Sequence, residues 1–391
     1  MKFLPSFYLI LAVFNFSVHA EIITDGTLGI QTNLLGPNYQ ITSDLGQQYG
    51  GNLFHSFQDF NLQNFESATF SGPDTVQNIL SRVTGGNSSH LDGLISSTIS
   101  EANLYFINPY GIMFGPNAQL DIQGSFHAST ADYLRLGNNG RFDARQPDNS
   151  LLTIAPIEAF GFFADSPHSL TVEGSELNVS FEKELSLIGG SLSIAETLLY
   201  SPLGQINLAS IAGAGEVIPS SEDLSISAPF GNLTIQHSEI STSDEGGGNI
   251  YIRGGQFVVS DSLIEARTYG HLKGGNIDVQ TQNTLITDGT IISTTTFGEG
   301  PGGNIILKST ENAFVTGEND EHTSILAVGA ENTGNAGTLV REAQNISFTN
   351  GAFITSTASE VGNGGDVSLK ATESVIFAGE DSYGDTSAII V

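Results

Sequence analysis

Carboxylates and histidines are the residues of this chain that could carry chemistry, because the sequence contains no cysteine. The lack of cysteine excludes disulfides, thiolate metal sites, iron–sulfur clusters and a cysteine nucleophile. The eight histidines are scattered without a His-x-x-x-His pair, so neither a zinc site nor a catalytic triad is indicated. Asp and Glu number 42, so some carboxylates will meet by chance, and proximity alone would not indicate a glycoside hydrolase. We predict no catalytic residue, no cofactor and no metal ligand set.

The charge of the chain narrows the choice of partners. Lys and Arg number 12, which leaves a formal net charge of -30 at pH 7. Such a chain is repelled by phosphate backbones and anionic lipid, so nucleic acid is excluded as a partner. A lyase that cleaves an acidic polymer would need a positive groove, and the same charge argues against that enzyme class.

Two acidic segments, residues 317–321 and 379–382, raise the question of calcium, which takes six to eight oxygen ligands. The surrounding sequence does not follow the Gly-Gly-x-Gly-x-Asp nonapeptide, and neither segment spaces its Asp residues as an EF-hand does. We interpret both segments as solvated loops that protrude from one side of the fold.

An internal repeat indicates which secondary-structure elements position the polar and acidic residues of the C-terminal half. Gly-Gly-Asn-Ile occurs at residues 247–250, 274–277 and 302–305, so the copies are 27 and 28 residues apart, and degenerate copies follow at 336–339 and 364–367. Between the copies, apolar residues alternate with Ser and Thr in short runs, and Gly, Asn and Asp stand where the chain must turn. This pattern predicts three short β-strands in each repeat and gives almost no support to helices.

A unit of this size cannot bury its inner face alone, whereas stacked copies bury a continuous one, so the repeats predict a parallel β-solenoid. Each coil should lie about 4.8 Å from the previous one. The stacking predicts an inward aliphatic ladder of Ile250, Ile277, Ile305, Leu339 and Val367. It also predicts an amide ladder of Asn249, Asn276 and Asn304, at positions that suit turns as well.

The first twenty residues read as a secretory signal peptide. Lys2 supplies the positive start, residues 7–16 form a short apolar run, and Val18-His19-Ala20 suits cleavage. The run is too short to span a bilayer, and no later run has transmembrane length. We therefore expect an exported chain that begins at Glu21 and has no transmembrane segment.

The N-terminal half carries a series of motifs that resembles a known family. The motifs stand at residues 25–29, 51–57, 79–86, 91–95, 102–118 and 124–130. In this order and spacing they resemble the secretion domain of filamentous haemagglutinin-type exoproteins, the passengers of two-partner secretion. The resemblance covers residues 21 to about 150.

This resemblance implies an all-β fold, a right-handed single-stranded parallel β-helix. A solenoid exposes a strand edge at each end unless it is capped, and residues 21–62 are the candidate N-terminal cap. The resemblance also implies an export signal that is read by an outer-membrane transporter with periplasmic POTRA domains. The family motif Asn-Pro-Asn-Gly-Ile maps onto Asn108, Pro109, Gly111 and Ile112, and this chain departs from it at Tyr110. A second motif is represented only by Asn52 and Leu53.

The Asn-Pro-Tyr-Gly sequence is also a β-turn signal in its own right, because Pro fixes one backbone angle and Gly adopts positive ones. A role in folding and a direct contact with the transporter therefore both remain open for this motif.

We expect four segments: a signal peptide (1–20), a secretion domain (21–150), an irregular continuation of the β-helix (151–243) and the repeats (244–391). No linker separates the last three, so one continuous solenoid is expected. The predicted function is that of an exported two-partner secretion passenger, an adhesin or surface-interaction scaffold whose candidate partners are the transporter and a surface receptor or glycan. The alternatives are a β-helical polysaccharide-degrading enzyme and a surface-layer protein that self-assembles through the end at Val391.

Overall fold

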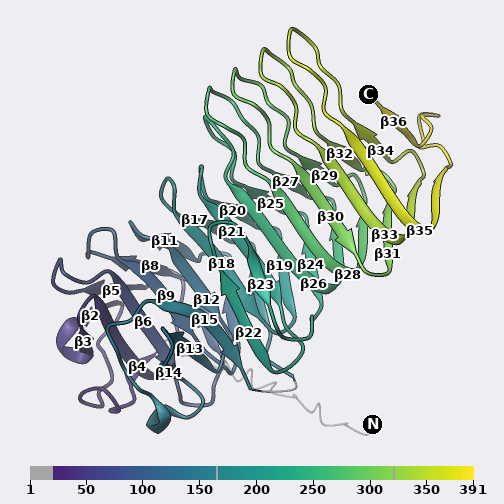
Figure 1. Cartoon of the computed structure of the whole chain (residues 1–391). Coiled ribbons are helices and arrows are strands. Elements are labelled where there is room, and N and C mark those ends of the chain that lie inside the picture. The colour runs from purple at the N-terminus through teal and green to yellow at the C-terminus, as the bar shows by residue number, and fades with distance from the viewer. Residues whose placement is uncertain (1–20, 164–165, 320–321) are drawn as a thin grey trace, which may run out of the picture.

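Strands form nearly all the regular structure of the computed structural model, which describes residues 21–163, 166–319 and 322–391. The predicted signal peptide lies outside the described residues. Two short 3-10 turns, η1 (Ser43–Leu45) and η2 (Pro147–Asn149), are the helical elements of the described part. Figure 1 shows the strands stacked as successive coils along one axis. The prediction of an all-β parallel β-helix is confirmed. No helix among the described residues is long and apolar enough to cross a bilayer.

Three sheets run along the stack, and a fourth lies beside it. Sheet A contains β1 (Ile22–Thr24), β3 (Gln47–Tyr49), β4 (Asn52–Phe60), β6 (Asn78–Val83), β7 (Ser89–Leu91), β9 (Asn103–Ile107), β10 (Ile112–Phe114), β12 (Phe126–Ser129), β16 (Leu170–Glu173), β18 (Glu184–Gly189), β19 (Leu192–Ala195), β21 (Gln205–Ser210), β24 (Leu233–Gln236), β26 (Asn249–Ser260), β28 (Ile277–Thr287), β30 (Ile305–Ser309), β31 (Asn312–Thr316), β33 (Leu339–Thr349) and β35 (Val367–Ala378). Sheet B contains β2 (Asn38–Thr42), β5 (Ser67–Ser71), β8 (Leu94–Ser97) and β11 (Gln119–Asp121). Sheet C contains β13 (Tyr133–Leu136), β14 (Gly140–Asp143), β15 (Ile157–Phe162), β22 (Gly215–Pro219) and β23 (Leu224–Ile226). Sheet D contains β17 (Glu176–Asn178), β20 (Leu198–Tyr200), β25 (Glu239–Ser241), β27 (Leu263–Glu265), β29 (Ile291–Ser293), β32 (Ile325–Ala327), β34 (Phe353–Thr355) and β36 (Ala388–Ile390).

Equivalent residues of the repeats face one another across consecutive coils. Ile250 lies opposite Ile277 in the pairing of β26 with β28, and Ile277 lies opposite Ile305 in the pairing of β28 with β30. The column continues through Leu339 to Val367. The first four side chains are fully buried in the main core. Alternate residues of each strand point inward, so one aliphatic residue per coil builds a continuous core.

The second glycine of each Gly-Gly pair has a steric role in this stack. A Cβ atom added at Gly303 would overlap the carbonyl oxygen of Gly275, which belongs to the preceding coil. The same overlap recurs at the equivalent position of each repeat, in the column Gly204, Gly248, Gly275, Gly303, Gly337 and Gly365. The repeat therefore needs glycine here because the backbones of neighbouring coils approach too closely for any side chain.

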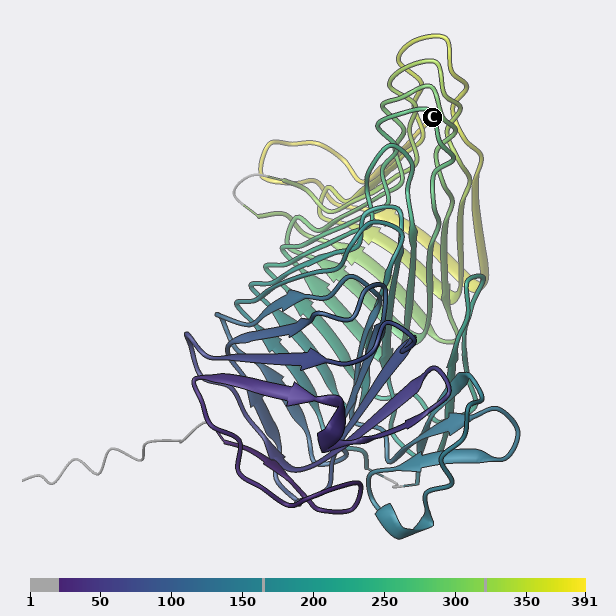
Figure 2. The ribbon, with the colours of Figure 1, turned by 90° about the vertical axis from the view of Figure 1, so that its left-hand side faces the viewer.

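The antiparallel sheet C is an addition to the stack that the sequence analysis did not anticipate, and its strands come from residues 133–143 and 157–226. In Figure 2 its strands stand outside the coils. Phe142 and Phe160 of this sheet pack with Leu80, Ile107 and Ile188 of sheet A in a second apolar core. These sheet A strands carry buried apolar residues on both faces, so their outer face must be covered, and sheet C covers it.

The N-terminal end of the stack is closed by antiparallel pairing. β1 and β3 both pair with β4, with Ile22 opposite Phe60 and Gln47 opposite Phe54. The backbone groups on that edge of β4 are thereby used within the chain, which protects the edge from pairing with another chain. This arrangement corresponds to the predicted N-terminal cap.

Candidate functional site

The Asn-Pro-Tyr-Gly turn joins β9 to β10, and its first residue is fully buried. The amide of Asn108 donates hydrogen bonds to Asn87 O at 3.0 Å and to Ser89 Oγ at 2.9 Å. Its Oδ1 atom accepts one from the backbone N–H of Tyr110 at 3.0 Å. Gly111 has a φ of 116° and closes the turn by donating to Asn108 O at 3.1 Å. Every polar group of the Asn108 side chain is thus used inside the fold.

Arg145 holds the outer side of the same turn. Its guanidinium donates to Pro109 O at 3.1 Å and forms an ion pair of 2.8 Å with the buried carboxylate of Asp132. The same group lies 4.6 Å from the centre of the Tyr110 ring, a cation–π contact. The residue that departs from the family motif therefore packs against a neighbouring arginine.

The structure places the other predicted export-motif residues in or beside the core. Leu53 is fully buried, and Ile112 is 2% exposed between Ser89 and Leu170 of the flanking coils. Asn52 donates from its amide to the backbone oxygens of Thr153 and Ala155, at 3.0 and 2.8 Å. Asn52 thus ties the first coil to the segment that leads into β15.

Asn52 also begins an amide ladder that the sequence analysis missed. Asn78 donates to Asn52 Oδ1 at 2.9 Å, and Asn103 donates to Asn78 Oδ1 at 3.1 Å. The three asparagines start β4, β6 and β9, and each is followed by Leu or Ile. This Asn-aliphatic pair, shared with the C-terminal repeats, is the sequence signal that could have revealed the ladder.

The predicted C-terminal ladder residues lie in one column. Asn249 Oδ1 accepts from the backbone of Asn276 at 3.0 Å, and Asn276 Oδ1 accepts from both the backbone and the amide of Asn304, at 2.9 and 3.0 Å. Asn304 Oδ1 then accepts from the backbone of Thr338 at 2.8 Å. Each amide satisfies a backbone donor of the next coil, which is a structural role.

Two buried histidines lie inside the N-terminal coils. Burial lowers the pKa of His55 to about 4, although Asp44 acts in the opposite direction, and neither ring nitrogen has a hydrogen-bond partner among the described residues. Burial also lowers the pKa of His127 to about 3. His127 Nδ1 lies 2.8 Å from Ser186 Oγ, and its ring stacks on Tyr105 at 4.3 Å. Both side chains are therefore neutral at physiological pH.

A groove of about 740 Å³ lies over sheet D and spans several coils. Its floor is formed by side chains that face one another in register on β20, β25, β27 and β29, which are Leu198, Glu239, Leu263 and Ile291. Three of the four are aliphatic and partly exposed, and the fourth is an exposed carboxylate. The groove therefore offers an apolar strip along the solenoid axis with one charge in it.

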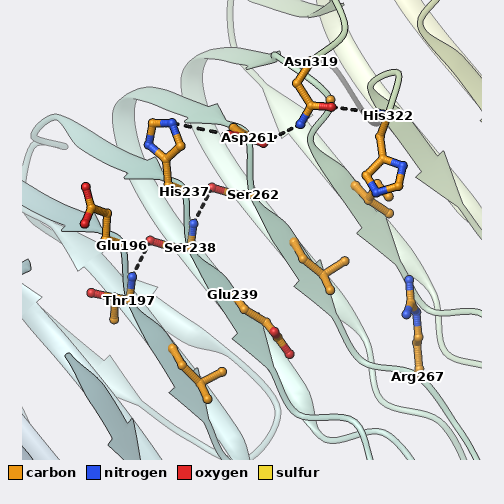
Figure 3. Close-up of a pocket in the computed structure, with 14 residues that line it drawn as sticks. Glu196, Thr197, His237, Ser238, Glu239, Asp261, Ser262, Arg267, Asn319 and His322 are labelled. Atoms are coloured by element: carbon orange, nitrogen blue, oxygen red, sulfur yellow. Dashed lines mark hydrogen bonds and ion pairs between the residues drawn. The ribbon is translucent and has the colours of Figure 1, made fainter. Parts of the chain in front are cut away.

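One wall of the groove is a column of turn residues with left-handed backbone conformation. Glu196, His237 and Asp261 have φ values of 51°, 48° and 45°. Beneath them the hydroxyl of Ser238 accepts from the backbone of Thr197 at 3.1 Å, and the hydroxyl of Ser262 accepts from the backbone of Ser238 at 3.1 Å. This repeated pattern fixes the turns in register, so their polar side chains rise along one edge of the groove (Figure 3).

Ion pairs and hydrogen bonds order the rim. His237 Nε2 lies 3.4 Å from Asp261 Oδ2, and the amide of Asn319 donates to Asp261 Oδ1. In Figure 3, Arg267 lies on the side away from this wall. Its guanidinium pairs with Glu265 at 2.9 Å. Partial desolvation in the groove and the nearby Glu265 raise the pKa of Glu239, and Arg267 partly offsets this shift.

Residues 20–257 match the family described as TPS secretion domain. Among curated proteins, a heme/hemopexin-binding protein of Haemophilus influenzae is 30% identical over 84 residues, which are 22% of this chain and 9% of that protein. The alignment thus spans less than a tenth of the length of that relative.

Two solved secretion domains align over nearly the whole chain at low similarity. The HMW1 secretion domain from Haemophilus influenzae gives a TM-score of 0.44 and 16% identity, and covers 96% of this chain and 98% of that one. A filamentous hemagglutinin secretion domain gives a TM-score of 0.34 and 13% identity, and covers 95% and 97%. The family match runs from before β1 into β26 and so includes all of sheet C.

Proposed function

The chain belongs to the TPS secretion domain family, and from this premise we propose that it is the exported passenger of a two-partner secretion system. Its destination is the outside of the outer membrane, where it acts as a non-enzymatic adhesin or surface-interaction scaffold. The family match over residues 20–257 supports export, and the stack of paired coils supports a scaffold whose surface does the work. The partner in export is an outer-membrane transporter with POTRA domains.

The proposed export mechanism rests on the burial of the export-motif residues in the folded chain. Leu53 and Asn108 are fully buried in the folded coils, so a transporter could contact their side chains only while the chain is unfolded. Folding outside the cell would then hide the signal and favour export in one direction. The chain has no cysteine that could cross-link it beforehand, and its charge of -30 opposes collapse.

We place residues 21–150 and 151–243 in one export unit. Sheet C joins β13 and β14 from the first segment to β15, β22 and β23 from the second. The bonds from Asn52 to Thr153 and Ala155 cross the same boundary. A cut near residue 150 would leave apolar residues of both segments uncovered.

The test is secretion of the full chain from cells that also make its transporter. Deletion of residues 103–115 and the single substitution Asn108→Ala should both lower the amount in the culture supernatant, with the total amount synthesised unchanged. Asn276→Ala is the control, because it makes the same substitution outside the motif, at an asparagine whose side chain also bonds to a neighbouring coil. Undiminished export of the deletion variant would show that residues 103–115 do not contain the export signal.

A binding measurement separates recognition from folding. The full chain, held unfolded in urea and diluted onto immobilised periplasmic domains of the transporter, should bind, and the Asn108→Ala chain should bind less. Equal binding of both chains would assign Asn108 to folding alone.

A further inference from the structure

We propose that the groove over sheet D binds an uncharged oligosaccharide that lies along the solenoid axis. The inference builds on the proposed function as a surface-interaction protein and names the class of ligand. Much of the groove lies beyond residue 257, including Asp261, Leu263, Arg267 and Ile291. The site is therefore built largely by the repeats of this chain, outside the segment that matches the family.

The spacing of the floor suits a chain of sugar rings. Leu198, Glu239, Leu263 and Ile291 come from consecutive strands of sheet D, so they repeat about every 4.8 Å along the axis. One pyranose ring has about the length of one coil spacing. An extended peptide presents the same face only about every 6.6 Å, because its side chains alternate, and so falls out of step with the coils. A glycan can place successive rings on successive floor residues.

The floor offers contacts for both the C–H face and the hydroxyl groups of a sugar ring. The aliphatic side chains of Leu198, Leu263 and Ile291 can pack against the C–H face of a ring. Glu239 stands between Leu198 and Leu263 in the register, where its carboxylate can accept hydrogen bonds from neighbouring hydroxyl groups. An oligosaccharide presents both surfaces together.

The charges of the groove argue against an anionic ligand. A polyanion would meet Glu196 and Glu239 as well as the overall charge of -30. Arg267 does not neutralise these carboxylates, because it is paired with Glu265, so a cationic peptide is the charged competitor, and the spacing of the floor disfavours it. Hydroxyl groups both donate and accept, so they can satisfy the carboxylates and Arg267 alike.

The experiment is isothermal titration calorimetry on the full exported chain. The probes are a panel of uncharged oligosaccharides, sialic acid- and uronic acid-containing counterparts, and a lysine-rich peptide. Glu239→Gln removes the charged acceptor from the floor, and Leu263→Lys places a long charged side chain across it. Asp121→Asn is the matched control, because it makes the same acid-to-amide change at an exposed position of sheet B. Circular dichroism melting of each variant confirms that it is folded.

We expect the wild-type chain and the Asp121→Asn chain to bind an uncharged oligosaccharide alike, and both groove variants to bind it at least tenfold more weakly. Three results would overturn the proposal: no uncharged glycan is bound, the groove variants bind as wild type does, or the charged probes bind more tightly. Secretion of each chain is measured in parallel. A chain that is exported normally and binds no glycan overturns the groove proposal alone, whereas failure of export bears on the proposed function.

Discussion

The amide of Asn108 donates a 2.9 Å hydrogen bond to the hydroxyl of Ser89, which joins the Asn-Pro-Tyr-Gly turn to the coil before it. The pairing of β7 with β10 places these two residues on neighbouring coils. In the folded chain the export-motif asparagine is therefore a coil-to-coil connector. A residue can serve a transporter in the unfolded chain and the fold afterwards, and the stability of the folded chain reports on the second role.

Asn108→Ala should lower the free energy of unfolding by about 1–3 kcal/mol, the range for leaving buried polar groups without a partner. The substitution strands Asn87 O and Ser89 Oγ and releases the backbone N–H of Tyr110. Urea denaturation followed by circular dichroism measures the change. Asn64→Ala, at an exposed position, should change it by less than about 0.5 kcal/mol. Equal midpoints for the two variants would contradict the structural role.

Gly303→Ala should destabilise the repeats by more than about 3 kcal/mol, because the new Cβ would overlap the backbone oxygen of Gly275. The neighbouring coils would have to separate and lose pairing between β28 and β30. Gly329→Ala serves as the control, since its Cβ would lie 3.3 Å from the Thr295 side chain and meets backbone only at 3.4 Å. Similar melting temperatures for both variants would show that the glycine column is not required.

The sequence predicted the repeat region well because its signal is local and periodic. Ile250, Ile277 and Ile305 occupy the same position of a repeated motif. In a parallel stack, residues at the same position of successive repeats lie next to one another. The Asn108 turn was predictable for a related reason, since Asn, Pro and Gly carry their turn preference with them.

Sheet C and the groove depend on contacts between distant segments, which no local pattern encodes. Asn52 bonds to Thr153, 101 residues away, and the groove collects residues from Glu196 to His322. The sequence signal for sheet C was the apolar outer face of strands such as Glu184–Gly189. A strand with apolar residues on both faces needs a packing partner on each face, and the coils supply only one of them.

Acid should destabilise the N-terminal coils through His55 and His127. Their pKa values in the folded chain are about 4 and about 3, below the value near 6.5 of an unfolded histidine. The stability tied to their neutral forms is therefore fully present above about pH 6.5 and is lost as the pH falls toward 4, at up to about 1.4 kcal/mol per pH unit for each histidine.

The measurement is urea denaturation of wild type and His55→Phe at several pH values between 4 and 7. The unfolding free energy of wild type should fall relative to that of His55→Phe as the pH decreases, because the variant cannot take up the proton. His168→Asn, at an exposed position, should follow wild type at every pH. A constant difference between wild type and His55→Phe would refute the assignment.

Arg341→Met should stabilise the chain, an unusual result for removal of an arginine. Arg341 is fully buried between Leu307 and Leu369 of the adjacent coils, and none of its side-chain nitrogens has a hydrogen-bond partner among the described residues. Burial lowers its pKa to about 9, which reflects the cost of holding the charge there. Replacing such a group with an apolar one of similar volume should raise the free energy of unfolding by about 1–4 kcal/mol.

Arg253 provides the matched control for this prediction, because it is equally buried but fully paired. Its guanidinium contacts Asp223 at 2.9 Å and Asp278 at 2.7 Å. Arg253→Met should therefore lower the free energy of unfolding by about 1–3 kcal/mol, since it removes both ion pairs and leaves the backbone oxygens of Leu224 and Asp278 without this donor. If the pairing of the arginine decides the outcome, denaturation at pH 7 should give changes in the free energy of unfolding of opposite sign for the two variants. A loss of stability in Arg341→Met would contradict the prediction.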